Sequence, residues 1–301
     1  MNTTMGSIRT VLAGDLHVAY VEFGPAGGDP VVLLHGFPYD IHSYERVAPL
    51  LAESGKRVIV PWLRGHGETR FADATTPRSG QQAALGADVL ALLDALRIPR
   101  AVLAGYDWGG RAAGVAAALW PHRVAGLVTV NGYLIQDIAA SVNPIRPELE
   151  AGFWYFWYFS TERGRRGLEA NRREIARVLW RRNSPEWAFA SETLERSAAS
   201  FANADWVELV IHSYRHRLGL AAGDPRYDHL EARLATVPPI AVPTITLDGE
   251  ADGNFPATDG SAYATHFTGA FEHRRVPAAG HNLPQEVPDA FATAVLDVTH
   301  L

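Results

Sequence analysis

A single aspartate stands where the sequence predicts a sharp turn from a strand into a helix. Gly-Tyr-Asp-Trp-Gly at residues 105–109 follows an apolar run at 101–104, typical of a buried strand, and precedes an alanine-rich run at 112–119, typical of a helix. This spacing is that of a nucleophile elbow, G-x-Nuc-x-G, in which glycines allow a tight turn and close packing. The nucleophile would be Asp107. The structural alternative is a plain helix cap, a position that aspartate favours.

The chemistry open to Asp107 follows from its carboxylate. With an ordinary pKa of about 3.9, this side chain is an anion at neutral pH and needs no base to activate it. Attack of a carboxylate on an ester or amide would give an anhydride, whereas attack on a saturated carbon with a leaving group gives a stable ester. Asp107 therefore favours opening an epoxide or displacing a halide over an esterase or protease reaction, and no G-x-S-x-G motif competes with it.

Two further residues have the types and the order needed to hydrolyse such an ester. Asp252 follows the apolar run at 243–247, and His281 follows the last predicted strand, near 273–276. The order nucleophile, acid, histidine is the one that hydrolases with this elbow use. We expect His281 to activate water and Asp252 to hold its other ring nitrogen, although Asp248 and Glu250 are neighbouring candidates for the acid.

An oxyanion hole is predicted beside the elbow. His-Gly-Phe-Pro at residues 35–38 follows the apolar strand at 31–34, at the edge where parallel sheets bind ligands. The backbone N–H groups of Phe37 and Trp108 would both point at the oxygen of Asp107 when its ester is hydrolysed. The alternative is an ordinary tight turn built from glycine and proline.

The elements that position these residues alternate between strand and helix. Apolar runs at 31–34, 58–60, 101–104, 124–130 and 243–247 predict buried parallel strands, and helices are expected near 41–53, 81–96 and 288–298. This alternation predicts an α/β fold with a mostly parallel, doubly wound sheet. Strand signals are missing from residues 133–240, so we expect a core of residues 1–132 and 241–301 with an inserted helical cap of residues 133–240.

Composition narrows the class of protein. The chain has 301 residues, a formal net charge of −6 and no cysteine, which predicts neither a nucleic-acid partner nor disulfides. No apolar run reaches the roughly 20 residues that span a membrane, and no secretion signal stands at the N-terminus, so a cytoplasmic protein is expected. Metal-binding and phosphate-loop motifs are absent, which predicts catalysis without cofactor or metal on a small-molecule substrate. The sequence is compatible with a homodimer but has no feature that requires one.

These motifs together resemble the α/β-hydrolase superfamily and, within it, the epoxide hydrolase and dehalogenase branch with an aspartate nucleophile. The matching pieces run in family order through both halves of the core: His-Gly-Phe-Pro at 35–38, Arg-Gly-His-Gly at 64–67, Gly-Tyr-Asp-Trp-Gly-Gly at 105–110, Gly-Glu-Ala-Asp at 249–252 and Gly-His at 280–281. One departure is Tyr106, where the branch often has histidine. The resemblance implies the α/β-hydrolase fold with an inserted cap.

The resemblance also indicates which groups would donate a proton to an opening epoxide. The aromatic run at 153–159 is similar to the epoxide hydrolase motif Tyr-x-x-Tyr-Phe, which places the first acid at Tyr155. The later His-Ser-Tyr-Arg at 212–215 is similar to the family's second cap tyrosine, which is Tyr214 here. Tyr158 is the replacement candidate for Tyr155, and the alternative for all of them is packing of the cap on the core.

Two other activities remain open. Haloalkane dehalogenases resemble the chain less, because Phe37 stands where one branch has a halide-binding asparagine. Fluoroacetate dehalogenases bind a carboxylate with Asp-Arg-x-x-Arg and hold fluoride with a His-Trp pair and a tyrosine. In this chain Arg111 matches the second arginine of that motif, and Trp157 matches the tryptophan. The resemblance therefore makes both of them candidate substrate-binding residues. We predict an epoxide hydrolase, with a haloacid or haloalkane dehalogenase as the alternative and a non-catalytic ligand-binding protein as a third.

Overall fold

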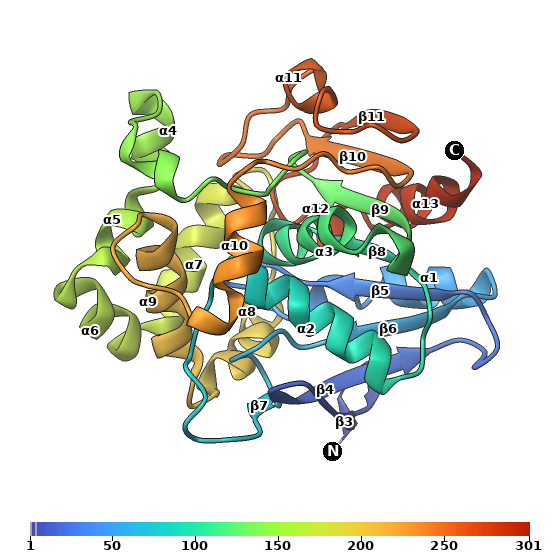
Figure 1. The fold of residues 1–301 in the computed structure, drawn as a ribbon, viewed down its shortest axis with the longest axis horizontal. Coiled ribbons are helices and arrows are strands. Elements are labelled where there is room, and N and C mark those ends of the chain that lie inside the picture. The colour runs from blue at the N-terminus through green and yellow to red at the C-terminus, as the bar shows by residue number, and fades with distance from the viewer. Residues whose placement is uncertain (1, 4) are drawn as a thin grey trace.

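The structure is organised around one twisted β-sheet (Figure 1). It is a computed structural model that describes residues 2–3 and 5–301, with side chains from residue 5 onward. Its strands are β1 (Asn2–Thr3), β2 (Gly6–Ser7), β3 (Arg9–Ala13), β4 (Leu16–Phe23), β5 (Pro30–Leu34), β6 (Arg57–Pro61), β7 (Arg70–Phe71), β8 (Ala101–Gly105), β9 (Val124–Val130), β10 (Thr244–Gly249) and β11 (Phe271–Val276). Among the described residues, nine strands form the main sheet in the order β11-β10-β9-β8-β5-β6-β4-β3, with β7 beside β4.

The centre of the sheet is parallel and buried on both faces. Strands β6, β5, β8, β9, β10 and β11 pair in parallel, whereas β4 pairs antiparallel with β6 and with β3. All of β8 is buried, and so is all of β5 after Pro30. Continuous apolar runs are what a strand covered on both sides requires. The predicted α/β fold with a mostly parallel, doubly wound sheet is therefore confirmed.

Helices cover both faces of the sheet. On one face α2 (Gln82–Ala95) packs against α3 (Asp107–Leu119), and on the other α1 (Val47–Glu53) packs against α13 (Pro288–Asp297) (Figure 1). The short helices α11 (Ser261–Ala264) and α12 (Leu283–Glu286) lie in the last third of the chain. Because the parallel strands end at one edge, the loops after β5, β8, β10 and β11 are brought together there.

A block of helices lies between β9 and β10 in the sequence. It contains α4 (Pro147–Gly152), α5 (Trp154–Ser160), α6 (Glu162–Ala170), α7 (Arg172–Asn183), α8 (Ser191–Ala198), α9 (Trp206–Arg217) and α10 (Asp228–Leu234). In Figure 1 helices α4 to α7 and α9 gather beside the end of β5, and α10 packs against α2. Residues 133–240 thus contain no strand of the main sheet among the described residues. Their assignment as a separate cap remains a prediction.

One predicted helix is wrong in its extent. Residues 41–53 were expected to form one helix, but a 3-10 turn at Ile41–Tyr44 precedes α1, which begins only at Val47. The cause is Asp40, whose buried carboxylate accepts the backbone N–H of His42 at 3.1 Å and fixes a tighter turn. Further 3-10 turns lie at Pro121–Arg123, Ala139–Val142, Ala199–Ala202, Pro225–Tyr227 and Val298–His300. Within the described part of the chain, no helix has the length and apolarity to cross a membrane.

Candidate active site

Asp107 occupies the turn between β8 and α3. Its φ is +51°, a left-handed conformation that a residue other than glycine rarely adopts. The flanking glycines are needed for space: a Cβ on Gly109 would collide with the backbone of Leu34, and one on Gly105 would crowd the backbone of Gly109. The glycines therefore let α3 approach the sheet closely, and the carboxylate of Asp107 projects from a tightly constrained bend.

The carboxylate of Asp107 accepts hydrogen bonds on one oxygen and faces a histidine with the other. The N–H of Phe37 donates to Oδ1 at 2.7 Å, and Nε2 of His281 lies 3.8 Å from Oδ2. Burial raises the pKa of Asp107, but the contact with His281 and the backbone N–H groups of Phe37 and Trp108 outweigh it and lower the pKa below its usual value. The predicted nucleophile is thus an anion whose Oδ1 already lies in the predicted oxyanion hole.

His281 lies between two carboxylates. Its Nδ1 is 2.9 Å from Oδ2 of Asp252, and its Nε2 faces Asp107. Burial lowers the pKa of His281, but the charges of Asp252 and Asp107 and the hydrogen bond to Asp252 raise it to about 10. The ring also stacks on Phe255, with centroids 5.7 Å apart. The imidazole is therefore a cation at neutral pH in this state.

The acid beside His281 is Asp252, as expected, and three donors hold it. The backbone N–H groups of Asn254 and Phe255 donate to Oδ1 at 2.7 and 2.9 Å, and the amide of Asn131 donates to Oδ2 at 3.2 Å. The position directly after β9 is another place from which the acid could come, but the sequence has Asn131 there, and an amide cannot be the anion. In the structure that amide instead binds the acid, a role that the sequence did not predict. Asn254 was not predicted either.

The two neighbouring candidates for the acid are engaged elsewhere. Asp248 accepts hydrogen bonds from Thr258 and Tyr263, and Glu250 pairs with Arg275 at 3.0 Å. Neither carboxylate contacts His281. The structure therefore brings Asp107, His281 and Asp252 together, whereas their catalytic roles remain predictions.

Two tyrosines from helices between β9 and β10 pack against each other near Asp107, whose charge acts on both phenols. Tyr155 of α5 and Tyr214 of α9 are buried, with ring centroids 5.3 Å apart and planes at 85°. The ring of Tyr214 packs on those of Phe37 and Trp108, with centroids 5.4 and 6.0 Å apart. The side-chain amide of Asn254 donates to the hydroxyl of Tyr155 at 3.5 Å. Burial raises the pKa of both phenols, so both hydroxyl groups keep their protons.

The replacement candidate Tyr158 lies elsewhere. It is only half-buried, and a Cβ on Gly167 would collide with its hydroxyl group, which therefore lies against α6. Tyr155 lines the small cavity over Asp107, and Tyr158 does not. Tyr214 is not part of that lining either, but its ring packs on Tyr155. The geometry thus favours Tyr155 over Tyr158 as the first proton donor.

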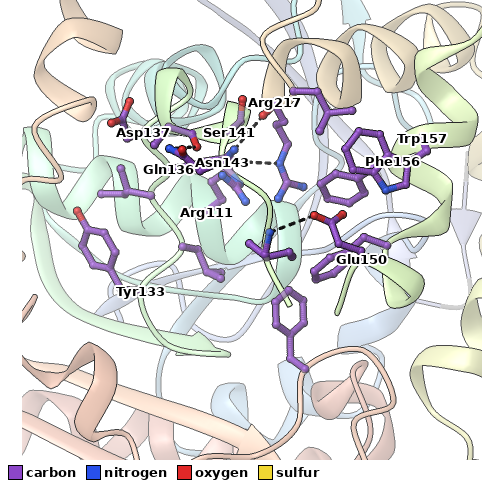
Figure 2. A pocket seen from close by; sticks show the side chains of 17 residues that line it. Arg111, Tyr133, Gln136, Asp137, Ser141, Asn143, Glu150, Phe156, Trp157 and Arg217 are labelled. Atoms are coloured by element: carbon purple, nitrogen blue, oxygen red, sulfur yellow. Dashed lines mark hydrogen bonds between the residues drawn. The ribbon is translucent and has the colours of Figure 1, made fainter. Parts of the chain in front are cut away.

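Two adjoining cavities lead to Asp107. The inner one, about 20 Å³, is lined by Asp107, Trp108, Arg111, Asn131, Leu134, Phe153, Tyr155, Phe156, Arg217, Phe255 and His281. The outer one, about 460 Å³ (Figure 2), adjoins it, because the two share Arg111, Leu134, Phe153, Phe156, Arg217 and Phe255. Arg111 lines both, whereas Trp157 is 47 % exposed and lines only the outer cavity. In the described part of the chain no group of His, Asp or Glu side chains is arranged to hold a metal ion.

Comparisons with known proteins identify a matching family and several similar proteins. Residues 29–284 match the family described as alpha/beta hydrolase fold. Epoxide hydrolase A of Mycobacterium tuberculosis is 27 % identical over 313 residues, covering 96 % of each chain. A haloalkane dehalogenase of Mycobacterium marinum is 37 % identical over 123 residues, 40 % of this chain and 39 % of that protein. The crystal structure of a candidate epoxide hydrolase from Klebsiella pneumoniae has 50 % identity, a TM-score of 0.96 and 98 % coverage of each chain.

Proposed function

Because the chain is a hydrolase that belongs to the α/β-hydrolase family and to its epoxide hydrolase branch, we propose that it opens an epoxide to a vicinal diol through a covalent ester on Asp107. The observation that supports this choice is the buried phenol of Tyr155 in the wall of the cavity over Asp107, with the buried phenol of Tyr214 packed against it. An opening epoxide leaves an alkoxide tethered to carbon, which needs a proton donor, whereas a departing halide needs none.

In the first step Oδ2 of Asp107 bonds to the less hindered ring carbon, and the bond between that carbon and the epoxide oxygen breaks. Tyr155 and Tyr214 hydrogen-bond that oxygen, and one of them gives it a proton. Oδ1, bound to the N–H of Phe37 at 2.7 Å, becomes the carbonyl oxygen of the ester. The product of this step is a hydroxyalkyl ester and one tyrosinate.

The charge on Asp107 disappears when the ester forms, and this changes His281. The carboxylates of Asp107 and Asp252 raise the pKa of His281 to about 10, so losing one of them lowers it again. The imidazolium can then return a proton to the tyrosinate and become a base. Neutral His281, oriented by Asp252, is the group that deprotonates the attacking water.

In the second step the hydroxide attacks the carbonyl carbon of the ester. The tetrahedral oxyanion is held by the N–H groups of Phe37 and Trp108. Its collapse breaks the bond to the diol oxygen, which takes the proton from His281, and leaves Asp107 as a carboxylic acid. That acid gives its proton to the neutral His281, which restores both the carboxylate of Asp107 and the imidazolium. Epoxide and one water have become one diol, and the enzyme is unchanged.

The second candidate function is a haloacid or haloalkane dehalogenase. It would use the same carboxylate, histidine and acid, with halide as the leaving group. Two observations favour it: the similarity of part of the chain to a haloalkane dehalogenase, and the guanidinium of Arg111 in the wall of the cavity, where a haloacid would need a cation.

Trapping the ester tests the proposal. In His281→Gln the ester should form and persist, because no base activates water. Incubation with styrene oxide should raise the intact mass by the mass of the epoxide, and Asp107→Asn should show no adduct. An adduct from bromoacetate or fluoroacetate but not from any epoxide would reject the epoxide assignment in favour of the dehalogenase. If the wild type turns over neither epoxides nor haloacetates faster than Asp107→Ala does, only the ligand-binding interpretation remains.

A further inference from the structure

Arg111 is a buried cation with an unsatisfied donor. It lies one helical turn after Asp107 on α3, is 8 % exposed, and lines both cavities. Its Nη1 atom is buried and has no hydrogen-bond partner among the described residues. Burial and the nearby charge of Arg217 lower its pKa to about 9, which still leaves it charged at neutral pH. Buried guanidinium groups are normally paired, so this donor is placed to meet a ligand.

Arg217 brings a second guanidinium to the same wall from a different element. It is the last residue of α9, and its side chain lies over the ring of Phe156 at 4.5 Å. Its Nε donates to Gln136 Oε1 at 3.2 Å, and Gln136 in turn donates to the backbone oxygen of Arg217 at 2.9 Å. Figure 2 shows Arg111 and Arg217 together among the side chains around the outer cavity. The head of Arg217 is thus held in place without being neutralised by these contacts.

The acidic groups nearby have other partners. Glu231 raises the pKa of Arg111, but less than burial and Arg217 lower it. The carboxylate of Glu231 accepts hydrogen bonds from the backbone N–H of Ala83 at 3.0 Å and from the side-chain amide of Gln82 at 3.1 Å. In the outer cavity, Asp137 accepts the N–H of Ala139 and Glu150 accepts the N–H of Ile145.

The inner cavity therefore has two guanidinium groups on its wall and one carboxylate, Asp107, that is already bound by N–H groups and His281. Two like charges brought into a shared, partly dry space repel each other unless an anion lies between them.

We propose that Arg111 and Arg217 bind a carboxylate of the substrate while its reactive carbon lies at Asp107, so that the enzyme acts on epoxides that bear an acid group. This inference rests on the proposed function and narrows its substrate class. The aromatic walls formed by Phe153, Phe156 and Phe255 hold the carbon chain between the two ends. Because Arg111 is one helical turn from Asp107, the acid and the epoxide are separated by a short chain.

A matched pair of substrates isolates the charge. 5,6-Epoxyhexanoate and 5,6-epoxyhexanamide have nearly the same shape, and only the first is an anion. Charge-assisted hydrogen bonds to two guanidinium groups should give the acid a kcat/KM about 10- to 100-fold higher than that of the amide. In Arg111→Met and in Arg217→Met this ratio should fall toward one. Arg166→Met removes a charge from a side chain that is 75 % exposed and pairs with Glu162, and the ratio should stay as in the wild type.

A binding measurement keeps the inference testable if turnover is lost. Hexanoate and hexanamide are titrated into Asp107→Asn by calorimetry, alone and combined with Arg217→Met. Tighter binding of hexanoate that disappears in the double variant supports the anion site. Equal turnover of acid and amide together with equal binding of hexanoate and hexanamide would overturn the inference and leave the epoxide hydrolase proposal standing. Failure on both epoxides, with hexanoate still bound through Arg217, would instead remove the epoxide assignment and keep the anion site.

Discussion

The charge on His281 predicts how the free energy of unfolding changes with pH. In the folded protein the pKa of His281 is raised to about 10, whereas an unfolded histidine has a pKa of about 6.5. Folding therefore favours the protonated ring. The stabilisation is fully present below about pH 6.5 and is lost as pH rises through 10, at about 1.4 kcal/mol per pH unit in between.

Replacing His281 by Gln removes this dependence. The difference in unfolding free energy between the wild type and His281→Gln should shrink by about 3 kcal/mol between about pH 7 and about pH 9.5. No reduction for solvent screening applies, because His281 is 1 % exposed. Urea unfolding followed by fluorescence of the eight tryptophans measures the difference at each pH, and groups that titrate alike in both proteins subtract out.

A second buried histidine supplies the control. Burial and the neighbouring His35 lower the pKa of His66 to about 3, so its neutral form is favoured by folding and its contribution is lost only as pH falls below about 6.5. The difference in unfolding free energy between His66→Gln and the wild type should therefore stay constant over the same alkaline pH range. A constant difference for His281→Gln as well would refute the idea that two carboxylates hold its ring as a cation, and the proposed change of His281 from acid to base would fail with it.

Tyr155→Phe and Tyr214→Phe should each slow ester formation from an epoxide about 10²- to 10⁴-fold in single-turnover mass measurements, while alkylation by a haloacetate, which needs no proton, should change far less; equal losses on both reagents would contradict their role as acids. Gly109→Ala should strongly lower the thermal midpoint, because its Cβ would collide with the backbone of β5, whereas Gly114→Ala in the same helix, with the nearest atom at 4.0 Å, should raise the free energy of unfolding by about 0.4–1 kcal/mol. A Gly109→Ala protein as stable as the Gly114→Ala protein would mean that the elbow tolerates a side chain.

The sequence predicts those parts of the molecule in which one local requirement dominates. Strands such as β5 and β8 are covered on both faces, so continuous apolar runs identify them. The elbow could be recognised because a left-handed Asp107 and the closely packed Gly109 leave few alternatives at their positions. The helix expected at 41–53 failed because one side-chain hydrogen bond from Asp40 decided between two kinds of turn.

Contacts between distant segments were beyond the reach of the sequence. Arg111 was identified from a resemblance to the fluoroacetate dehalogenase motif. Arg217 lies 106 positions further along and is brought to the cavity by α9, which packs on α5. Likewise, the contact of Asn131 with Asp252 joins loops after two different strands. The sequence does not show which of these side chains reaches the inner cavity. Trp157, chosen from a motif, lines only the outer cavity, whereas Arg217 lines both.

The two proposals are linked through the charge of the cavity. Before reaction, the anionic Asp107 partly offsets His281, Arg111 and Arg217, which together line the inner cavity. Ester formation removes that anion, and the remaining positive charge makes a protonated His281 less favourable, as the second step requires. With a neutral epoxide, the buried guanidinium of Arg111 and the half-buried one of Arg217 would then line the cavity without a counter-ion. A carboxylate on the substrate supplies this counter-ion throughout the reaction, so the charges that line the inner cavity favour an acidic substrate.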